Sequence, residues 1–69
     1  MRYYVVNYDG IPLHAQPANG YTKLQAIERC QRECEEASKI FGGSVSSYTR
    51  YFHVADENFK IIKDLDTAI

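Results

Sequence analysis

Residues 22–43 of this 69-residue chain read TKLQAIERCQRECEEASKIFGG, and this stretch decides the fold. Thr22 followed three residues later by Gln25 matches a capping box, in which each side chain bonds a backbone N–H at the start of a helix. The pair Gly42-Gly43 can supply the left-handed conformation with which helices commonly end. The stretch therefore predicts one helix over residues 22–41.

Side chains along this helix divide into two faces when they are placed at the helical spacing of about 100° per residue. One stripe is small or apolar and consists of Ala26, Ile27, Cys30, Cys34, Ala37 and Phe41, with Leu24 at its border. The opposite side is charged and consists of Glu28, Arg29, Arg32, Glu35, Glu36 and Lys39. We expect the stripe to pack on a β-sheet and the charged side to be a solvated face rather than a binding site.

Before the helix, residues 2–8 are rich in aromatic and β-branched side chains, which favour a strand. Asp9-Gly10 is the usual signal for a two-residue hairpin turn, so residues 11–15 are expected to form the return strand. Such a turn pairs Val6 with Leu13 on one face of the sheet. The other face then collects Tyr3, Val5, Asn7, Pro12, His14 and Gln16.

After the helix, residues 48–55 and 59–63 have the composition of two further strands. A two-residue turn at residues 57–58 pairs Val54 with Ile61 on one face. The other face then collects Tyr51, His53, Ala55, Lys60, Ile62 and Asp64.

These blocks predict the α+β class and a single small domain over residues 1–69. The expected order is β-β-α-β-β, an antiparallel sheet with one amphipathic helix packed on one face. If residues 11–15 do not form a true strand, the order becomes β-α-β-β with the helix still on one side. The strand order within the sheet is left open.

The composition is that of an ordinary globular protein, with 45% hydrophobic and 25% charged residues. The net charge of −1 supplies no field that would gather nucleic acid or an anionic membrane, so neither is an expected partner. We see no apolar run of membrane-spanning length and no signal leader, which favours a cytoplasmic protein.

Two cysteines and two histidines raise the question of a metal site. Cys30 and Cys34 are too far apart at i,i+4 on a helix for a disulfide. Both lie on the stripe that faces the sheet, whereas His14 and His53 are predicted on the far face. One ion could not reach both sides, so we expect buried thiols and neither a metal nor another cofactor.

No catalytic constellation is recognisable, and we expect no enzyme. The side of the sheet away from the helix is predicted to be an uncovered, partly aromatic surface, which on a small domain usually has a partner. The candidate binding residues on this outer sheet face are Tyr3, Val5, His14, Tyr51, His53, Lys60 and Ile62.

The leading hypothesis is a small non-enzymatic protein-binding or regulatory module. Analogy at the level of the fold alone suggests a phage or mobile-element type. One alternative is a homodimer of structural role, in which the outer face binds a copy of itself. Another is weak nucleic-acid binding through residues 48–53, which alternate aromatic and basic side chains.

Overall fold

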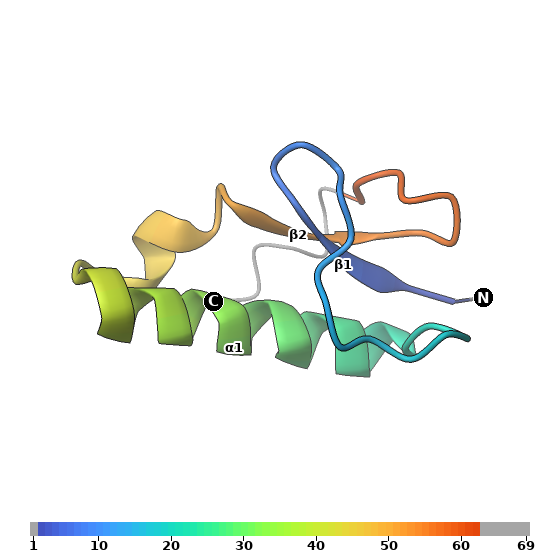
Figure 1. Ribbon diagram of the computed structural model, residues 1–69, viewed down its shortest axis with the longest axis horizontal. Coiled ribbons are helices and arrows are strands. Elements are labelled where there is room, and N and C mark those ends of the chain that lie inside the picture. The colour runs from blue at the N-terminus through green and yellow to red at the C-terminus, as the bar shows by residue number, and fades with distance from the viewer. Residues whose placement is uncertain (1, 63–69) are drawn as a thin grey trace.

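The computed structural model describes residues 2–62. In chain order it contains strand β1 (Tyr4–Asn7), helix α1 (Lys23–Phe41), the short 3₁₀ helix η1 (Val45–Tyr48) and strand β2 (Phe52–Ala55). β1 and β2 form a two-stranded antiparallel sheet that lies over α1 (Figure 1). The α+β class predicted from the sequence is confirmed.

Helix α1 has both of the predicted terminal signals. The Thr22 hydroxyl oxygen accepts from the Gln25 N–H at 3.2 Å, and Gln25 Oε1 accepts from the Thr22 N–H at 3.1 Å, so the capping box is formed. At the other end Gly42 has φ 83°, and its N–H donates to the Ser38 carbonyl at 2.8 Å. Within residues 2–62, no helix combines the length and the apolar character that crossing a membrane requires.

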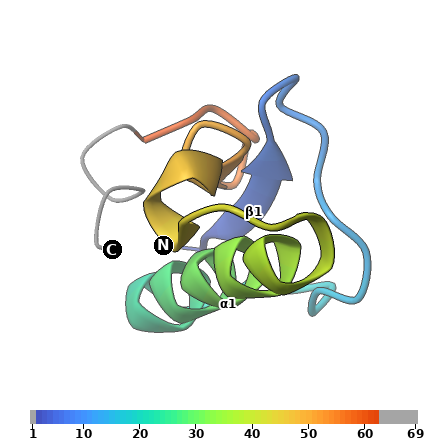
Figure 2. The same ribbon diagram turned by 90° about the vertical axis from the view of Figure 1, so that its left-hand side faces the viewer.

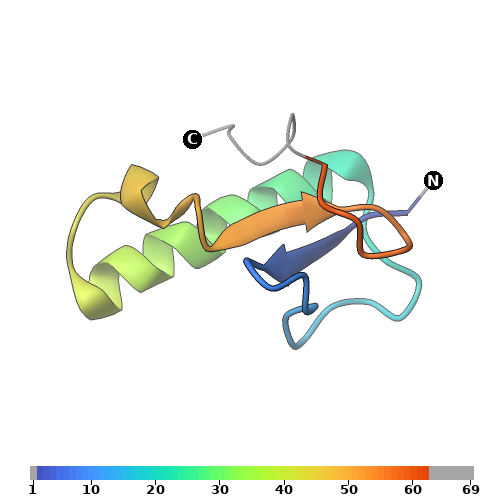
Figure 3. The same cartoon turned by 90° about the horizontal axis from the view of Figure 1, so that it is seen from above.

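The register of the sheet decides which side chains face the helix. Tyr4 pairs with Ala55, Val5 with Val54, Val6 with His53 and Asn7 with Phe52. Because neighbouring residues of a strand point to opposite faces, Val5 and Val54 share one face and Val6 and His53 share the other. Seen from above, the two strands lie side by side and run roughly along the direction of α1 (Figure 3).

The hydrophobic core lies between the sheet and the helix. Val5 and Val54 pack against Ala26 and Cys30, and all four are buried. The side chains packed around this cluster are Tyr3, Leu13, Tyr21, Ile27 and Phe52. Complete burial of one valine side chain contributes roughly 1.5–3 kcal/mol, so few residues carry most of the stability of this small chain.

The predicted two-residue turn at Asp9-Gly10 is wrong. The Asn7 N–H donates to the Ile11 carbonyl at 2.9 Å, and the Gly10 N–H donates to the Asn7 carbonyl at 2.9 Å. The loop thus has three residues and ends at Gly10 with φ 79°. The side-chain Oδ1 of Asn7 also accepts the N–H groups of Asp9 and Ile11, at 2.9 and 3.1 Å, which fixes this longer turn.

The second hairpin departs from its prediction in the same way. The Asp56 N–H donates to the Lys60 carbonyl at 3.0 Å, and the Phe59 N–H donates to the Asp56 carbonyl at 2.9 Å. Phe59 occupies the position of Gly10 and has φ 62°. Oδ1 of Asp56 accepts from Asn58 and Lys60 at 2.8 and 3.0 Å, so this turn repeats the first one bond for bond.

The extra loop residue shifts each hairpin register by one position. Val6 forms a bridge with Pro12 instead of pairing with Leu13, and Ala55 forms a bridge with Ile61. Beyond these single bridges the return segments are not strands, so the predicted four-stranded sheet is reduced to two strands within residues 2–62.

Residues 11–15 fail as a strand because the backbone turns away at Ala15, whose φ is 61°. The Leu13 N–H still donates to the Val5 carbonyl at 3.1 Å, and the side chain of Gln16 completes the pairing with Val5. Its Oε1 accepts the Val5 N–H at 2.7 Å, and its Nε2 donates to the Val5 carbonyl at 2.9 Å. A side-chain amide thus substitutes for backbone at this edge of β1.

The segment between α1 and β2 is also not the predicted strand. Val45–Tyr48 form η1, and residues 49–51 form a turn before β2 begins at Phe52. η1 packs beside the last turns of α1 (Figure 2). The Tyr48 hydroxyl donates to the Gly42 carbonyl, which ties this segment to the end of the helix.

Candidate functional site

The outer face of the sheet, away from α1, carries a continuous set of side chains. The pairs Tyr4–Ala55 and Val6–His53 point to this side. The strand residues of the outer face are Tyr4, Val6, His53 and Ala55. Just past the strand ends, the rings of Tyr8 and Tyr51 lie 6.0 Å apart in an edge-to-face arrangement at one end of the sheet.

Exposure along this face is uneven. Val6 and Ala55, at its centre, have no accessible surface, so the face is not bare there. Tyr8 and Tyr51 are 64% and 43% exposed. The Tyr51 ring also lies 6.1 Å from that of Tyr48, whose hydroxyl is held by the Gly42 carbonyl. Tyr8, Tyr48 and Tyr51 form a tyrosine cluster at the end of the sheet where β1 stops and β2 starts.

A second aromatic contact lies next to the opposite end of the outer face. The rings of Tyr4 and Phe59 are 5.1 Å apart with an interplanar angle of 67°. Phe59 is an exposed aromatic residue with positive φ, a conformation that costs a bulky residue of order 1–3 kcal/mol. The contact with Tyr4 offsets part of that cost.

Of the predicted binding residues, His53 lies on the outer face and Tyr51 lies at the end of the sheet beside it. Tyr51 belongs to the tyrosine cluster, and His53 sits in β2 opposite Val6. The Nε2 atom of His53 lies 2.9 Å from the carbonyl oxygen of Arg50, and the ring is half-buried.

The predicted positions of Tyr3 and Val5 on the outer face are wrong. Val5 is buried in the core with Val54, and Tyr3 packs against the same cluster. The physical reason is the strand register: Val5 pairs with Val54, which faces the helix. Side chains alternate along β1, so the helix covers the side that carries Val5 and not the side that carries Val6.

Lys60 and Ile62 are displaced from the outer face by the one-residue shift in the register of the second hairpin. Ile61 forms the bridge with Ala55 and so shares the outer face, which directs its two neighbours to the other side. His14 is exposed beyond the Pro12 bridge, and its backbone carbonyl accepts a hydrogen bond from Arg29. The seven predicted residues are therefore not brought together on one surface.

The two cysteines are buried on the helix side of the sheet, as the stripe predicted. The Cys30 thiol donates to the Phe52 carbonyl at 3.3 Å. Burial raises the pKa of the Cys34 thiol. A hydrogen bond with Cys30 opposes this shift, and the charges of Glu33 and Glu35 add to it, so the pKa is raised overall. Within residues 2–62, no three His, Cys, Asp or Glu side chains are grouped closely enough to hold a metal ion.

Arg29 is the residue that sequence reasoning missed, since it was placed on the solvated face of the helix. Its side chain is only 13% exposed and pairs with Glu33, Nε to Oε2, at 2.9 Å. It also donates to the Tyr21 hydroxyl at 2.9 Å and to the backbone carbonyls of His14 and Ala15 at 2.9 and 3.0 Å. The guanidinium thus ties the segment after the first hairpin to α1.

These contacts of Arg29, which we call the Arg29 clamp, also affect the pKa of its guanidinium. Burial by itself lowers the pKa of Arg29, but the hydrogen bonds and charges of Glu33 and Tyr21 outweigh it, so the pKa is raised overall. The guanidinium of Arg29 is therefore charged at neutral pH. The contacts come from carbonyls distant in sequence, and no local pattern signals them.

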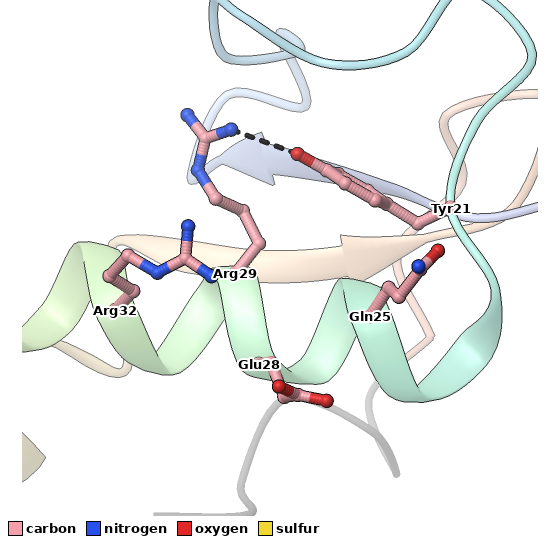
Figure 4. Close-up of a pocket in the computed structure, with 5 residues that line it drawn as sticks. All are labelled: Tyr21, Gln25, Glu28, Arg29 and Arg32. Atoms are coloured by element: carbon pink, nitrogen blue, oxygen red, sulfur yellow. Dashed lines mark hydrogen bonds between the residues drawn. The ribbon is translucent and has the colours of Figure 1, made fainter.

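A pocket of about 280 Å³ lies beside this clamp and is lined by Tyr21, Gln25, Glu28, Arg29 and Arg32. Figure 4 shows the Arg29 guanidinium directed at the Tyr21 hydroxyl rather than into open space. The Oε1 atom of Gln25 is engaged in the capping box. Tyr21, Gln25 and Arg29 therefore use polar groups at this pocket to hold the fold.

No protein-family model, curated protein or solved structure matches this chain. Two surface features bear on function, the outer face of the sheet and the pocket beside Arg29. The outer face has exposed aromatic rings whose area is available to a partner, whereas the pocket is built around an arginine that already has four partners. The outer face is the stronger candidate site.

Proposed function

We propose that this chain is a small protein-binding or regulatory module that acts without catalysis, through the outer face of its sheet. The observation that carries the proposal is the tyrosine cluster, in which Tyr8 and Tyr51 stay exposed while their rings are held against each other. The proposed binding surface is the tyrosine cluster with the neighbouring His53, and no longer includes Tyr3 or Val5.

Exposed tyrosines suit a protein interface for a physical reason. Each ring buries a large apolar area when a partner covers it, and the hydroxyl keeps a hydrogen bond at the rim. Here the rings touch one another at 6.0 and 6.1 Å, and the Tyr48 hydroxyl is anchored to the Gly42 carbonyl. A partner would therefore meet side chains that have already lost much of their rotamer freedom, which lowers the entropic cost of binding.

The end of α1 provides an internal comparison. Ile40 and Phe41 are more exposed than Tyr8, but among the described residues no ring contact holds Phe41. Scattered exposed apolar residues are normal on a small protein, whereas a cluster of rings in mutual contact is a better marker of an interface. Phe41 is therefore a matched control for the tyrosine cluster.

The proposal is tested by site-specific photo-cross-linking in the cells that produce the protein. A benzophenone amino acid replaces Tyr8 in one variant, Tyr51 in a second and Phe41 in a third. We expect covalent protein adducts from the first two positions and none above background from the third. Adding Tyr51→Ala to the variant labelled at position 8 is expected to reduce the adduct several-fold, because the labelled ring loses the neighbour that orients it.

Two results would overturn the proposal. One is the absence of protein adducts from positions 8 and 51 under conditions in which a cross-linker introduced into a known complex reacts. The other is an equal yield from position 41, which would mean that exposure alone, and not the outer face, determines contact.

A further inference from the structure

We infer that the segment after the first hairpin is a two-state element, in which Tyr21 and Ala15 compete for the same backbone groups of Tyr3. The structure shows the Tyr21-paired state, and the Ala15-paired state is a minor state of the same chain. The exchange takes place at the edge of β1 that faces away from β2, so it leaves the pairing of the two strands and the tyrosine cluster unchanged.

The backbone hydrogen bonds along this edge show that the chain changes partner. The Leu13 N–H donates to the Val5 carbonyl at 3.1 Å, as in a regular hairpin. Hydrogen-bonding residues on one edge of an antiparallel strand recur at every second position, so a hairpin that continued past Leu13 would bond Ala15 to Tyr3. Instead, the Tyr3 N–H donates to the Tyr21 carbonyl at 3.0 Å, and the Tyr21 N–H donates to the Tyr3 carbonyl at 2.7 Å. Tyr21 therefore occupies the place of Ala15.

The side chain of Gln16 fills the gap that this change of partner leaves. In a continuous hairpin the Val5 N–H would donate directly to the Leu13 carbonyl. Here the Gln16 amide lies between these groups, since its Oε1 accepts from the Val5 N–H at 2.7 Å and its Nε2 donates to the Leu13 carbonyl at 2.8 Å. Val5 therefore needs the Gln16 amide in the Tyr21-paired state and not in the Ala15-paired state.

Two other positions are sensitive to which state is present. Ala15 has φ 61°, whereas a strand requires a negative φ, so the exchange relieves strain at this residue. Gly20 has φ 79°, and a Cβ added there would lie 3.0 Å from Cβ of Arg2 and 3.1 Å from the carbonyl oxygen of Tyr3. A side chain at residue 20 therefore disfavours the Tyr21-paired state.

The Tyr21-paired state is the major one because the exchange breaks contacts that stabilise it. The Tyr21 ring packs against the hydrophobic core, and its hydroxyl accepts a hydrogen bond from Arg29. Arg29 also binds the carbonyls of His14 and Ala15. Pairing of Ala15 with Tyr3 releases Tyr21 from the sheet edge and gives the Ala15 carbonyl to the Tyr3 N–H. The exchange therefore dismantles both the Arg29 clamp and the pocket beside it.

Amide hydrogen exchange measured by NMR distinguishes the two states. In the Tyr21-paired state the Tyr21 N–H is hydrogen-bonded, whereas the Ala15 N–H has no acceptor within residues 2–62. The double variant Gln16→Ala/Gly20→Ala removes the inserted amide and adds the disfavoured side chain. We expect the exchange rate to rise about tenfold or more at Tyr21 and to fall by a similar factor at Ala15.

Single variants test the direction of the effect, with the minor population measured by chemical exchange saturation transfer at the Val5 amide nitrogen. Gln16→Ala should raise this population about fivefold. Ala15→Gly added to Gln16→Ala relieves the strain of the Tyr21-paired state and should lower the population again by about threefold or more. Gly10→Ala is the control, because it strains a turn that both states share and should leave the population unchanged.

The inference is overturned by a double variant in which Tyr21 keeps its wild-type protection. It is equally overturned if both amides lose protection while that of Val6 keeps it, since the segment then frays without changing partner. If circular dichroism shows that the double variant is unfolded, Gln16→Ala decides the question by itself. A Gln16→Ala protein without a minor state at Val5, or with one whose population does not fall when Ala15→Gly is added, refutes the two-state element.

Discussion

The two hairpins of this chain, residues 4–13 and 53–62, have the same turn hydrogen bonds but differ in the residue that ends the loop. In both, an Asx side chain, Asn7 or Asp56, accepts two backbone N–H groups and holds a three-residue loop. In both, the third loop residue has positive φ, but it is Gly10 in one and Phe59 in the other. The comparison separates what the turn needs, an Asx acceptor, from what it tolerates, a strained aromatic residue.

The hairpins also differ in how they are attached to the helix. Arg29 donates to the carbonyls of His14 and Ala15, immediately after the first hairpin. No helix side chain makes a corresponding hydrogen bond to residues 57–62 among those that the structure describes. The first hairpin is therefore tied to α1 by Arg29, whereas the described contacts of the second are its turn, the Ala55–Ile61 bridge, the Ile62–Val54 hydrogen bond and the ring contact of Phe59.

The largest effect is expected from removing the clamp. Arg29→Met keeps most of the apolar stem but loses four hydrogen bonds and leaves Glu33 without its partner, so we expect a loss of about 3 kcal/mol in the free energy of unfolding. Urea unfolding measures the total. In the variant, the rate of native-state amide exchange should increase much more in residues 13–16 than in residues 60–62. An equal increase in the two regions would show that the two hairpins are attached to the helix in the same way.

The next largest loss of stability is expected from the core valines, which occupy equivalent positions in the two hairpins. Val5 and Val54 are paired with each other and equally buried, so Val5→Ala and Val54→Ala should each cost about 2 kcal/mol. Ile11→Ala, at an exposed position, serves as the control and should cost little. Unfolding free energies for the two valine variants that differ by more than about 1 kcal/mol would contradict the equivalence of the two halves.

A smaller effect is expected at the Asx residues. Asn7→Ala and Asp56→Ala each leave two backbone N–H groups without their acceptor, at a partly exposed site, for a loss of about 1–2 kcal/mol. Asn58→Ala is the control, because its side chain is exposed in the loop that Asp56 holds. Thermal unfolding of the four proteins is the measurement, and an Asp56→Ala protein as stable as the control would mean that the turn does not depend on its acceptor.

These turns also show how much of the fold can be predicted from the sequence. The helix was predictable because its signals are local: Thr22 and Gln25 cap one end and Gly42 closes the other. The hairpins were misread because Asp9-Gly10 favours a two-residue turn, while the competing signal is an Asx residue two positions before Asp9. Given Asn7 and Asp56 as acceptors, the three-residue loop and the shifted register follow from sequence.

The candidate site was predicted least well, because the wrong side of β1 was expected to face away from the helix. Val5 and Tyr3 lie at the core and not on the expected binding surface, whereas Val6 lies on the outer face. His53 lies on the outer face as expected, because the side of β2 that carries Val54 is the one that faces the helix. The Arg29 clamp could not be predicted from the sequence, because its backbone acceptors are distant in sequence and lie close to Arg29 only in the folded chain.

The smallest effect tests the strained residue that distinguishes the two turns. Phe59→Ala loses the ring contact with Tyr4 but keeps a side chain in the left-handed conformation, so we expect a loss of about 1 kcal/mol. Phe59→Gly loses the same contact and relieves the strain, so it should be more stable than Phe59→Ala by about 1 kcal/mol and close to wild type. Gly10→Ala introduces the strain into the first turn, where no Cβ contact within 4 Å opposes the substitution, and should cost the same amount. Unfolding free energies that place Phe59→Gly below Phe59→Ala would mean that the left-handed conformation at residue 59 costs the chain nothing, and that the two turns differ in sequence without differing in strain.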